Sequence, residues 1–133
     1  MFDSILVANR GEIALRIMRT AQAMGIQTIA IYVEADKDAP HVRFADKAVL
    51  LPDGGYLDID AVLDAAQKSN AGAIHPGYGF LSENSEFATR VIKEKIVWVG
   101  PSPKVISVMG DKLKAKELAI KASVPTLPMT SNE

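Results

Sequence analysis

Short apolar runs alternate along the chain with longer stretches in which apolar residues recur every three or four positions. The longer stretches are typical of helices, and the first has an apolar stripe from Ile13 to Met24 followed by Gly25 at the position of a C-terminal cap. The short runs are typical of buried parallel strands. The predicted strands are Ser4–Ala8, Gln27–Val33, Lys47–Leu51, Gly72–His75 and Ile96–Val99.

Start signals and prolines place the remaining helices. A short helical turn is predicted around His41–Asp46, Asp58 is predicted to cap a helix of about ten residues, and Ser82 or Asn84 to begin another. Two more helical pieces are predicted, at Pro103–Met109 and at about Asp111–Ala122. The alternation of strands and helices predicts an α/β fold, with a parallel sheet of about five strands and helices on both faces. Ligands of such sheets collect at the carboxyl ends of the strands.

Domain organisation follows from length and from the composition of the C-terminal segment. The chain has 133 residues, which is a one-domain length that buries roughly two thirds of the unfolded surface. Residues 125–133 contain two prolines and end in polar residues, which favours a linker. We therefore expect one domain over residues 1–124 and a linker over 125–133 that leads toward an absent domain.

Composition excludes several classes of function. The net charge is −1, with 15 basic and 16 acidic residues well mixed, so neither a nucleic-acid surface nor a polybasic membrane surface is expected. The absence of cysteine excludes disulfides and thiol nucleophiles, and two histidines disfavour a His-built zinc site. The N-terminus is a poor signal peptide, and no apolar stretch approaches ~20 residues. The expected location is the cytoplasm, or the mitochondrial matrix if a presequence was removed.

The first strand-to-helix turn, Ala8–Glu12, is the place where a dinucleotide-binding sequence pattern would occur. A dinucleotide-binding turn needs the pattern Gly-x-Gly-x-x-Gly, so that a pyrophosphate can approach the backbone. Only Gly11 is present, and the bulky Asn9 and Arg10 fill the turn. Glu34, at the end of the second strand, could mimic a ribose-binding acid but is weak evidence alone. A Rossmann-type dehydrogenase is therefore disfavoured.

The turn after the fourth predicted strand, within His75–Asn84, is a second candidate site. Gly77 and Gly79 flank Tyr78, which permits positive backbone dihedrals and leaves amide groups open to a ligand. The alternative is a tight turn with a packed aromatic ring and a capped helix. His75 alone is more typical of a hydrogen-bonded structural histidine, and no catalytic residue can be assigned from spacing.

Lys112 is a third candidate, because it opens the last predicted helix in the segment Met109–Lys112. A cation at a helix N-terminus opposes the helix dipole unless an anion lies nearby. A bound phosphate would resolve that conflict, and lysine serves well as a phosphate-binding point charge. The alternative is a solvated lysine paired with Asp111.

Taken together, five segments resemble biotin carboxylase, because they occur in the order and at the spacing of that family. The block HPGYGFLSEN is highly specific to it. The resemblance extends from Phe2 to about Pro128 and includes the biotin carboxylase components of acetyl-, propionyl- and methylcrotonyl-CoA carboxylases and of pyruvate carboxylase. The segments are Ile5–Arg19 (ILVANRGEIALRIMR), Glu34–Asp46 (EADKDAPHVRFAD), Ala73–Asn84 (AIHPGYGFLSEN), Gly100–Pro103 (GPSP) and Met109–Lys112 (MGDK).

The resemblance implies a fold, a reaction and roles for five residues. It implies a Rossmann-like domain that precedes an ATP-grasp domain (a pre-ATP-grasp domain). The parent enzyme would use MgATP and bicarbonate to carboxylate biotin on a carrier protein, through carboxyphosphate. Lys112 matches a lysine that contacts ATP, Tyr78 and Gly79 match a turn that lines the biotin site, and Arg16 and Arg19 match positions at a dimer interface. For the two arginines the alternative is a solvated helix face.

Two departures from the family pattern limit what the chain itself is expected to do. The segment 52–58 is shorter than the usual loop, so we expect a trimmed surface connection with little consequence for the site. The chain also stops where the ATP-grasp domain should begin, so the metal-binding glutamates and most ATP, bicarbonate and biotin contacts are missing. It also lacks the Ala-Met-Lys-Met motif of a biotin carrier. Alone, it is therefore expected neither to carboxylate biotin nor to hydrolyse ATP.

The expected partners are the ATP-grasp and C-terminal regions of the same enzyme, the biotin carboxyl carrier, the carboxyltransferase and a second copy in a homodimer. Two other functions stay open at this stage. One is a stand-alone nucleotide- or anion-binding module, and the other is a non-catalytic docking domain that uses Arg16 and Arg19. Carbamoyl-phosphate synthetase shares a similar first domain but lacks the HPGYGFLSEN block.

Overall fold

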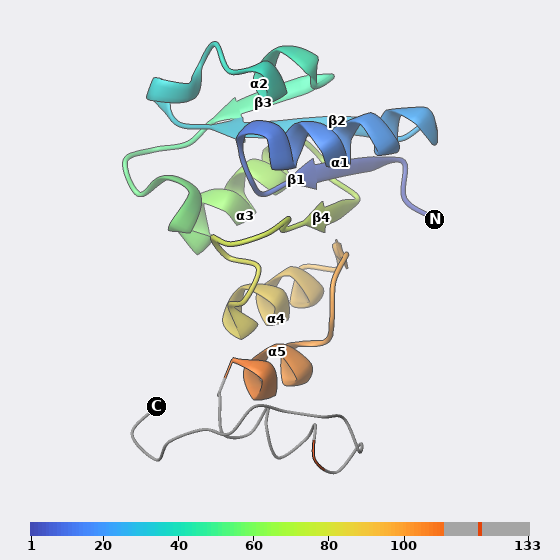
Figure 1. Cartoon of the computed structure of the whole chain (residues 1–133), viewed down its shortest axis with the longest axis vertical. Helices are drawn as coiled ribbons and strands as arrows, with labels where there is room; N and C mark the ends of the chain where they lie inside the picture. The colour runs from blue at the N-terminus through green and yellow to red at the C-terminus, as the bar shows by residue number, and fades with distance from the viewer. Residues whose placement is uncertain (111–119, 121–133) are drawn as a thin grey trace.

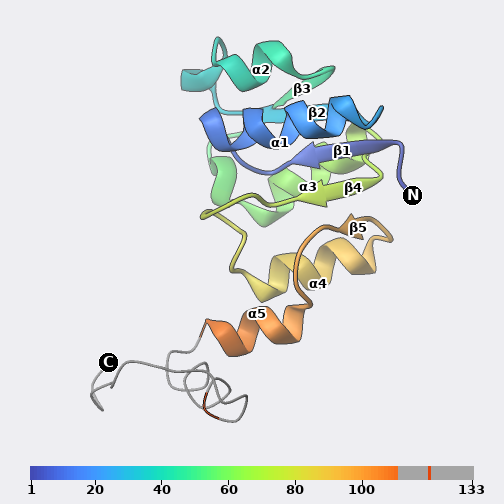
Figure 2. The same cartoon turned by 45° about the vertical axis from the view of Figure 1, so that its right-hand side comes forward.

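The computed structural model describes residues 1–110 and residue 120, and its centre is a parallel five-stranded sheet. The strand order is β3-β2-β1-β4-β5 (Figures 1 and 2). The predicted α/β fold is therefore confirmed. The strands are β1 (Ser4–Val7), β2 (Gln27–Tyr32), β3 (Lys47–Leu50), β4 (Ala73–His75) and β5 (Val97–Trp98).

The strands are shorter than their apolar runs by one or two residues, but the flanking residues still extend the hydrogen-bond ladder. The amide of Ala8 donates to the carbonyl of His75 at 2.9 Å, and the amide of Leu51 donates to the carbonyl of Tyr32 at 2.7 Å. Val99 likewise donates to Ile74 at 2.9 Å. The apolar runs thus predict where the sheet is paired and buried, while the assigned strand ends differ slightly.

The helices begin and end at the signals found in the sequence. Asp58 Oδ1 accepts a hydrogen bond from the amide of Ala61 at 3.1 Å, and Asn84 rather than Ser82 caps the next helix. Gly25 has a φ of +78°, as a C-terminal glycine cap requires. The helices are α1 (Gly11–Ala23), α2 (Pro40–Phe44), α3 (Ile59–Lys68), α4 (Ser85–Lys93) and α5 (Pro103–Met109), with 3₁₀ turns η1 (Glu34–Asp36) and η2 (Gly55–Leu57).

Helices cover both faces of the sheet, with α1 and α2 on one face and α3 and α4 on the other (Figures 1 and 2). Successive residues of β1 point to opposite faces. Leu6 packs in the cluster that contains the apolar residues of α3 and α4, whereas Val7 packs against Ala14 and Met18 of α1. Both faces are therefore buried in the way that the near-continuous apolar runs predict.

Several predictions fall on residues that the structure does not describe. These are the helix predicted at Asp111–Ala122, the lysine Lys112 and the linker at 125–133. The proposed division into residues 1–124 and 125–133 therefore stays a prediction. Among the helices of the described residues, none is long and apolar enough to cross a membrane.

Candidate functional site

The candidate site lies at the carboxyl edge of the sheet, where the segments after β1, β2 and β4 come together. These three strands are neighbours in the sheet, so the residues that follow them reach the same edge. The segments are the turn Asn9–Gly11, the 3₁₀ turn Glu34–Asp36 and the loop Pro76–Phe80. This is the edge at which open parallel sheets bind ligands.

The turn after β1 is closed by an ion pair instead of being open to a nucleotide. Arg10 reaches across to the segment after β2, where its Nε and Nη2 contact Asp36 Oδ2 and Oδ1, each at 2.7 Å. Tyr56 donates from its hydroxyl to Asp36 Oδ2, also at 2.7 Å. Glu34, the acid considered in the sequence, is exposed and lies 3.6 Å from Lys37. Asp36, and not Glu34, is therefore the acid at this edge of the sheet, and its carboxylate already accepts hydrogen bonds from Arg10 and Tyr56.

The ion pair fixes the charge state of this cluster. The hydrogen bond from Arg10 lowers the pKa of Asp36 to about 2, against the opposing effect of burial. Burial and the neighbouring carboxylate raise the pKa of Tyr56 to about 12. Asp36 is therefore ionised and Tyr56 neutral near pH 7, which is the state in which the phenol can donate and the carboxylate accept.

The segment 52–58 is exposed over Pro52–Gly54, as a surface connection requires, but it also contributes Tyr56 to the site. Tyr56 is buried, with 8% of its surface exposed. Its ring also packs on Phe80, with the ring centroids 5.3 Å apart. The reason is that the 3₁₀ turn η2 directs this aromatic residue inward, so a short connection still supports the loop that carries Tyr78.

Both histidines make hydrogen bonds to the backbone. His41 is fully buried, and its Nε2 lies 3.1 Å from the carbonyl of Ile31. Because a carbonyl can only accept, Nε2 carries the proton and Nδ1 accepts from the amide of Gly11 at 3.3 Å. His75 Nδ1 accepts from the amide of Gly77 at 3.0 Å. Burial lowers the pKa of both imidazoles, so both are neutral near pH 7.

The loop Pro76–Phe80 has the backbone geometry that its glycines predict. Gly77 and Gly79 have φ of +68° and +73°, and Phe80 has φ of +47°. Tyr78 projects outward with 79% of its surface exposed, and the space around Gly79 is open. The open position at Gly79 beside an exposed phenol can bind a flat polar ligand by contact and hydrogen bonding, but it provides no acid–base pair.

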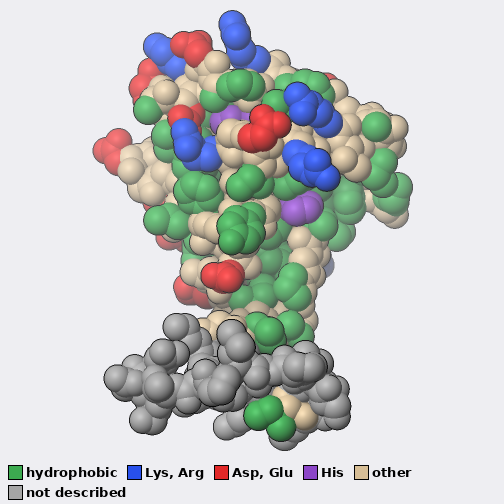
Figure 3. Space-filling view, viewed as in Figure 1, with side chains coloured by type: hydrophobic (Ala, Val, Ile, Leu, Met, Phe, Trp, Pro, Cys, Tyr) green, Lys and Arg blue, Asp and Glu red, His purple; other side chains and the backbone are tan. Residues whose placement is uncertain are grey.

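Arg16 and Arg19 are both exposed on α1, as predicted. Arg19 lies 3.6 Å from Glu12 on the same exposed surface, and such a pair contributes little to stability. Figure 3 shows basic side chains beside hydrophobic ones on this side of the molecule. Whether either arginine lies at a dimer interface stays a prediction.

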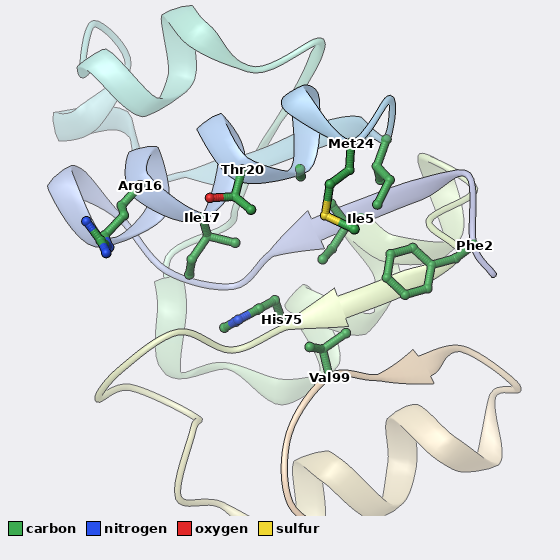
Figure 4. A pocket seen from close by; sticks show the side chains of 10 residues that line it. Phe2, Ile5, Arg16, Ile17, Thr20, Met24, His75 and Val99 are labelled. Atoms are coloured by element: carbon green, nitrogen blue, oxygen red, sulfur yellow. The ribbon is translucent and has the colours of Figure 1, made fainter.

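Arg16 also borders a groove of about 370 Å³ beside α1 (Figure 4). The groove lies between α1 and the sheet, and its lining includes Ile5 of β1, His75 at the end of β4 and Val99 after β5. Phe2, Met24 and Val99 form apolar parts of its lining, and His75 lies at its floor. The fold thus brings Arg16 and His75 to one groove, whereas Tyr78 is not among the residues that line it.

Four residues of the site had no role assigned from sequence, namely Asn9, Arg10, Asp36 and Tyr56. Asn9 had a detectable signal, because a bulky polar residue directly after a buried strand needs hydrogen-bond partners. Asp36 and Tyr56 had no such signal in the sequence, because Asp36 lies 26 residues from Arg10 and 20 residues from Tyr56. In residues 1–110 and 120, no three His, Asp or Glu side chains are grouped so that they could hold a metal ion.

Two known proteins are similar to the chain to the same degree. The chain is 50% identical over 135 residues to Biotin carboxylase 2 of Bacillus subtilis, covering 98% of this chain and 30% of that protein. It is also 50% identical over 131 residues to the mitochondrial propionyl-CoA carboxylase alpha chain of Homo sapiens, covering 96% of this chain and 18% of that one. The chain therefore spans less than a third of the length of these relatives.

A solved structure agrees with the sequence relatives. The biotin carboxylase domain dimer of 2-oxoglutarate carboxylase from Hydrogenobacter thermophilus, in complex with MgADP, ADP and bicarbonate, matches with a TM-score of 0.92 and 47% identity. The match covers 98% of this chain and 29% of that chain. In addition, residues 1–106 match the family model of the biotin carboxylase N-terminal domain. The chain therefore belongs to the family of biotin carboxylase N-terminal domains.

Proposed function

We propose that this chain is the N-terminal part of an ATP-dependent biotin carboxylase, in which it lines one side of the biotin site and supplies one lysine to ATP. The observation that supports this most is the loop Pro76–Phe80, which presents an exposed Tyr78 at the ligand-binding edge of a sheet of this family. The parent enzyme would carboxylate biotin on a carrier protein, using MgATP and bicarbonate. The solved relative that holds MgADP and bicarbonate supports the same substrates.

Within this proposal, the described residues bind and orient, and the remainder of the enzyme does the chemistry. Tyr78 and Gly79 would contact biotin, and Lys112, outside the described residues, would neutralise phosphate charge during phosphoryl transfer. The described part of the chain groups no acidic residues for Mg²⁺, so the ion that accompanies ATP would be held elsewhere in the enzyme. The proposed partners are the rest of the enzyme, the biotin carrier and the carboxyltransferase, in the cytoplasm or the mitochondrial matrix.

A chimeric enzyme tests these roles. Residues 1–133 replace the matching residues of Bacillus subtilis Biotin carboxylase 2, and steady-state rates are measured against ATP and biotin separately. Tyr78→Ala should raise KM for biotin, and Lys112→Ala should raise KM for ATP, each by roughly tenfold or more, because a contact to ligand is lost. Lys104→Ala, at an exposed position on α5, is the control. Unchanged KM values in both variants would contradict the assigned roles.

A stand-alone nucleotide-binding module is the second function to test. The structure offers little support for it, since Arg10 and Asp36 close the turn where a pyrophosphate would lie. Titration calorimetry of the purified chain with MgATP should show no binding tighter than about millimolar. Micromolar binding, or ATP hydrolysis by the chain that bicarbonate stimulates, would favour an independent activity.

The proposed homodimer would use the exposed face of α1. Arg16→Glu in the chimera should shift the sedimentation coefficient toward the monomer, because reversing a charge at a close interface is costly. Lys104→Glu reverses a charge on α5 and should leave the coefficient unchanged. Identical sedimentation of Arg16→Glu and the parent chimera would remove this interface from the proposal.

A further inference from the structure

Asn9 links the first turn directly to the loop that carries Tyr78. It is almost fully buried, with 1% of its surface exposed. Its Nδ2 donates to the carbonyls of Pro76 and Tyr78 at 3.0 and 2.7 Å, and its Oδ1 accepts from the amide of Arg10 at 2.9 Å. This orientation of the amide is fixed, because two carbonyls require donors and an N–H requires an acceptor. Both protons of the NH₂ group are thus used to hold one loop.

The loop depends on these hydrogen bonds. Among the described residues, no backbone amide donates to the carbonyls of Pro76 or Tyr78, so Asn9 is their partner. The packing is also close, since a Cβ at Gly77 would lie 2.7 Å from Asn9 Nδ2. Tyr78 itself is exposed and makes no side-chain hydrogen bond to described residues. The position of its ring is therefore set by its backbone, and the backbone is held by Asn9.

Arg10 holds the other end of the same loop through a chain of contacts. It pairs with Asp36, which accepts from the hydroxyl of Tyr56, and the ring of Tyr56 packs on Phe80. Phe80 has a φ of +47°, which a non-glycine residue rarely adopts without support. The adjacent residues Asn9 and Arg10 thus fix the two ends of a loop that follows them by some seventy positions.

We propose that Asn9 and Arg10 are positioning residues for the Tyr78 loop, and that the first turn of this domain orders the biotin-binding loop instead of binding a nucleotide. The side chains of Asn9 and Arg10 are engaged with the Tyr78 loop and with Asp36, and the turn lacks the glycine pattern that lets a pyrophosphate approach the backbone. The assignment of the loop to biotin rests on the proposed function, whereas its support by Asn9 rests on the contacts alone.

Ser4 provides a matched control at the opposite edge of the sheet. Its Oγ accepts from the amide of Gly72 at 2.9 Å and lies 3.2 Å from the carbonyl of Asn70. Like Asn9, it is a buried polar residue that ties β1 to the chain next to β4. Ser4→Ala therefore removes similar hydrogen bonds without touching the Tyr78 loop.

The first test measures loop order in the chain itself by NMR. In the natural chain, the amides of residues 77–80 should have order parameters near ~0.85, and the side-chain NH₂ of Asn9 should be protected from exchange. Asn9→Ala should lower the loop values below ~0.6, while Ser4→Ala should leave them unchanged. A loop that is already mobile in the natural chain, or one that stays ordered in Asn9→Ala, would overturn the proposal. The measurement on the natural chain needs no variant to fold.

The second test measures kinetics in the chimera. Asn9→Ala should raise KM for biotin roughly tenfold, as expected from one or two lost hydrogen bonds, and should change KM for ATP less than about twofold. Ser4→Ala should leave both within about twofold. Equal changes in both KM values for Asn9→Ala would indicate a general loss of structure and overturn the proposal. An inactive parent chimera would instead defeat the proposed function, and loop order would still decide the role of Asn9.

Discussion

Replacing Asp36 by asparagine removes the one charge that both Arg10 and Tyr56 contact. The side chain keeps its shape, but its new NH₂ group faces donors, and the guanidinium of Arg10 loses its counter-ion. We expect the variant to fold, since Asp36 lies at the edge of the sheet and not in its apolar core. It should be less stable than the natural chain near neutral pH, and the difference between the two should depend on pH.

The magnitude follows from the pKa of Asp36. Its pKa falls from an ordinary value of 3.8 to about 2 in the folded chain, which corresponds to about 2 kcal/mol. Since the side chain of Arg10 is 49% exposed, solvent screening reduces this to about 1–2 kcal/mol. A lowered pKa stabilises the fold at pH values above about 4, and the stabilisation is lost as pH falls through about 2.

Urea unfolding at a series of pH values measures this effect. The fluorescence of Trp98, the only tryptophan, reports on the fold because its ring packs edge-on against Phe87 at a centroid distance of 5.6 Å. The stability gap between the natural chain and Asp36→Asn should be about 1–2 kcal/mol near pH 6. By about pH 2.5 it should shrink to less than half of that. Equal m-values in the two proteins would support the two-state comparison.

Asp60→Asn is the matched control. Asp60 lies 2.6 Å from Arg90, as close as Asp36 lies to Arg10, but its side chain is 82% exposed. Exposed pairs contribute less than about 1 kcal/mol, so this variant should show a small gap with little pH dependence. A gap for Asp36→Asn that stays constant from about pH 6 to pH 2.5 would refute the reasoning, because it would show that the charge of Asp36 is not coupled to folding.

Two further changes test the packing and the helix starts. Phe87→Ala should cost about 3–5 kcal/mol in urea unfolding, because the ring is fully buried between α4 and the sheet; a loss below about 1 kcal/mol would contradict the burial of this ring in the core. Asp58→Ala should cost about 1 kcal/mol, because the cap of α3 loses its hydrogen bond to the amide of Ala61, and thermal unfolding monitored by circular dichroism would measure it. An unchanged Tm would mean that the cap contributes nothing.

The sequence predicts the fold well where signals are local. Apolar runs locate all five strands, Gly25 and Asp58 mark helix ends, and the glycines around Tyr78 indicate positive dihedrals. Each of these depends on a residue and its immediate neighbours. The family likewise follows from motif order, and the comparisons confirm it.

The side-chain contacts that hold the candidate site together could not be predicted, because they join positions that are distant in the sequence. Nothing near Tyr56 in the sequence indicates that its hydroxyl reaches Asp36 or that its ring packs on Phe80. Asn9 likewise bonds to carbonyls 67 and 69 residues away. Such contacts exist only once the strand order β2-β1-β4 brings three loops to one edge.

We propose that this chain is one part of a biotin carboxylase and has no carboxylase activity by itself. The most direct test is ATP hydrolysis that requires both bicarbonate and biotin, measured in the isolated chain and in the chimera with Bacillus subtilis Biotin carboxylase 2. We predict no such activity in the isolated chain and clear activity in the chimera. A stable, folded chimera without activity, or an active isolated chain, would contradict this division of roles.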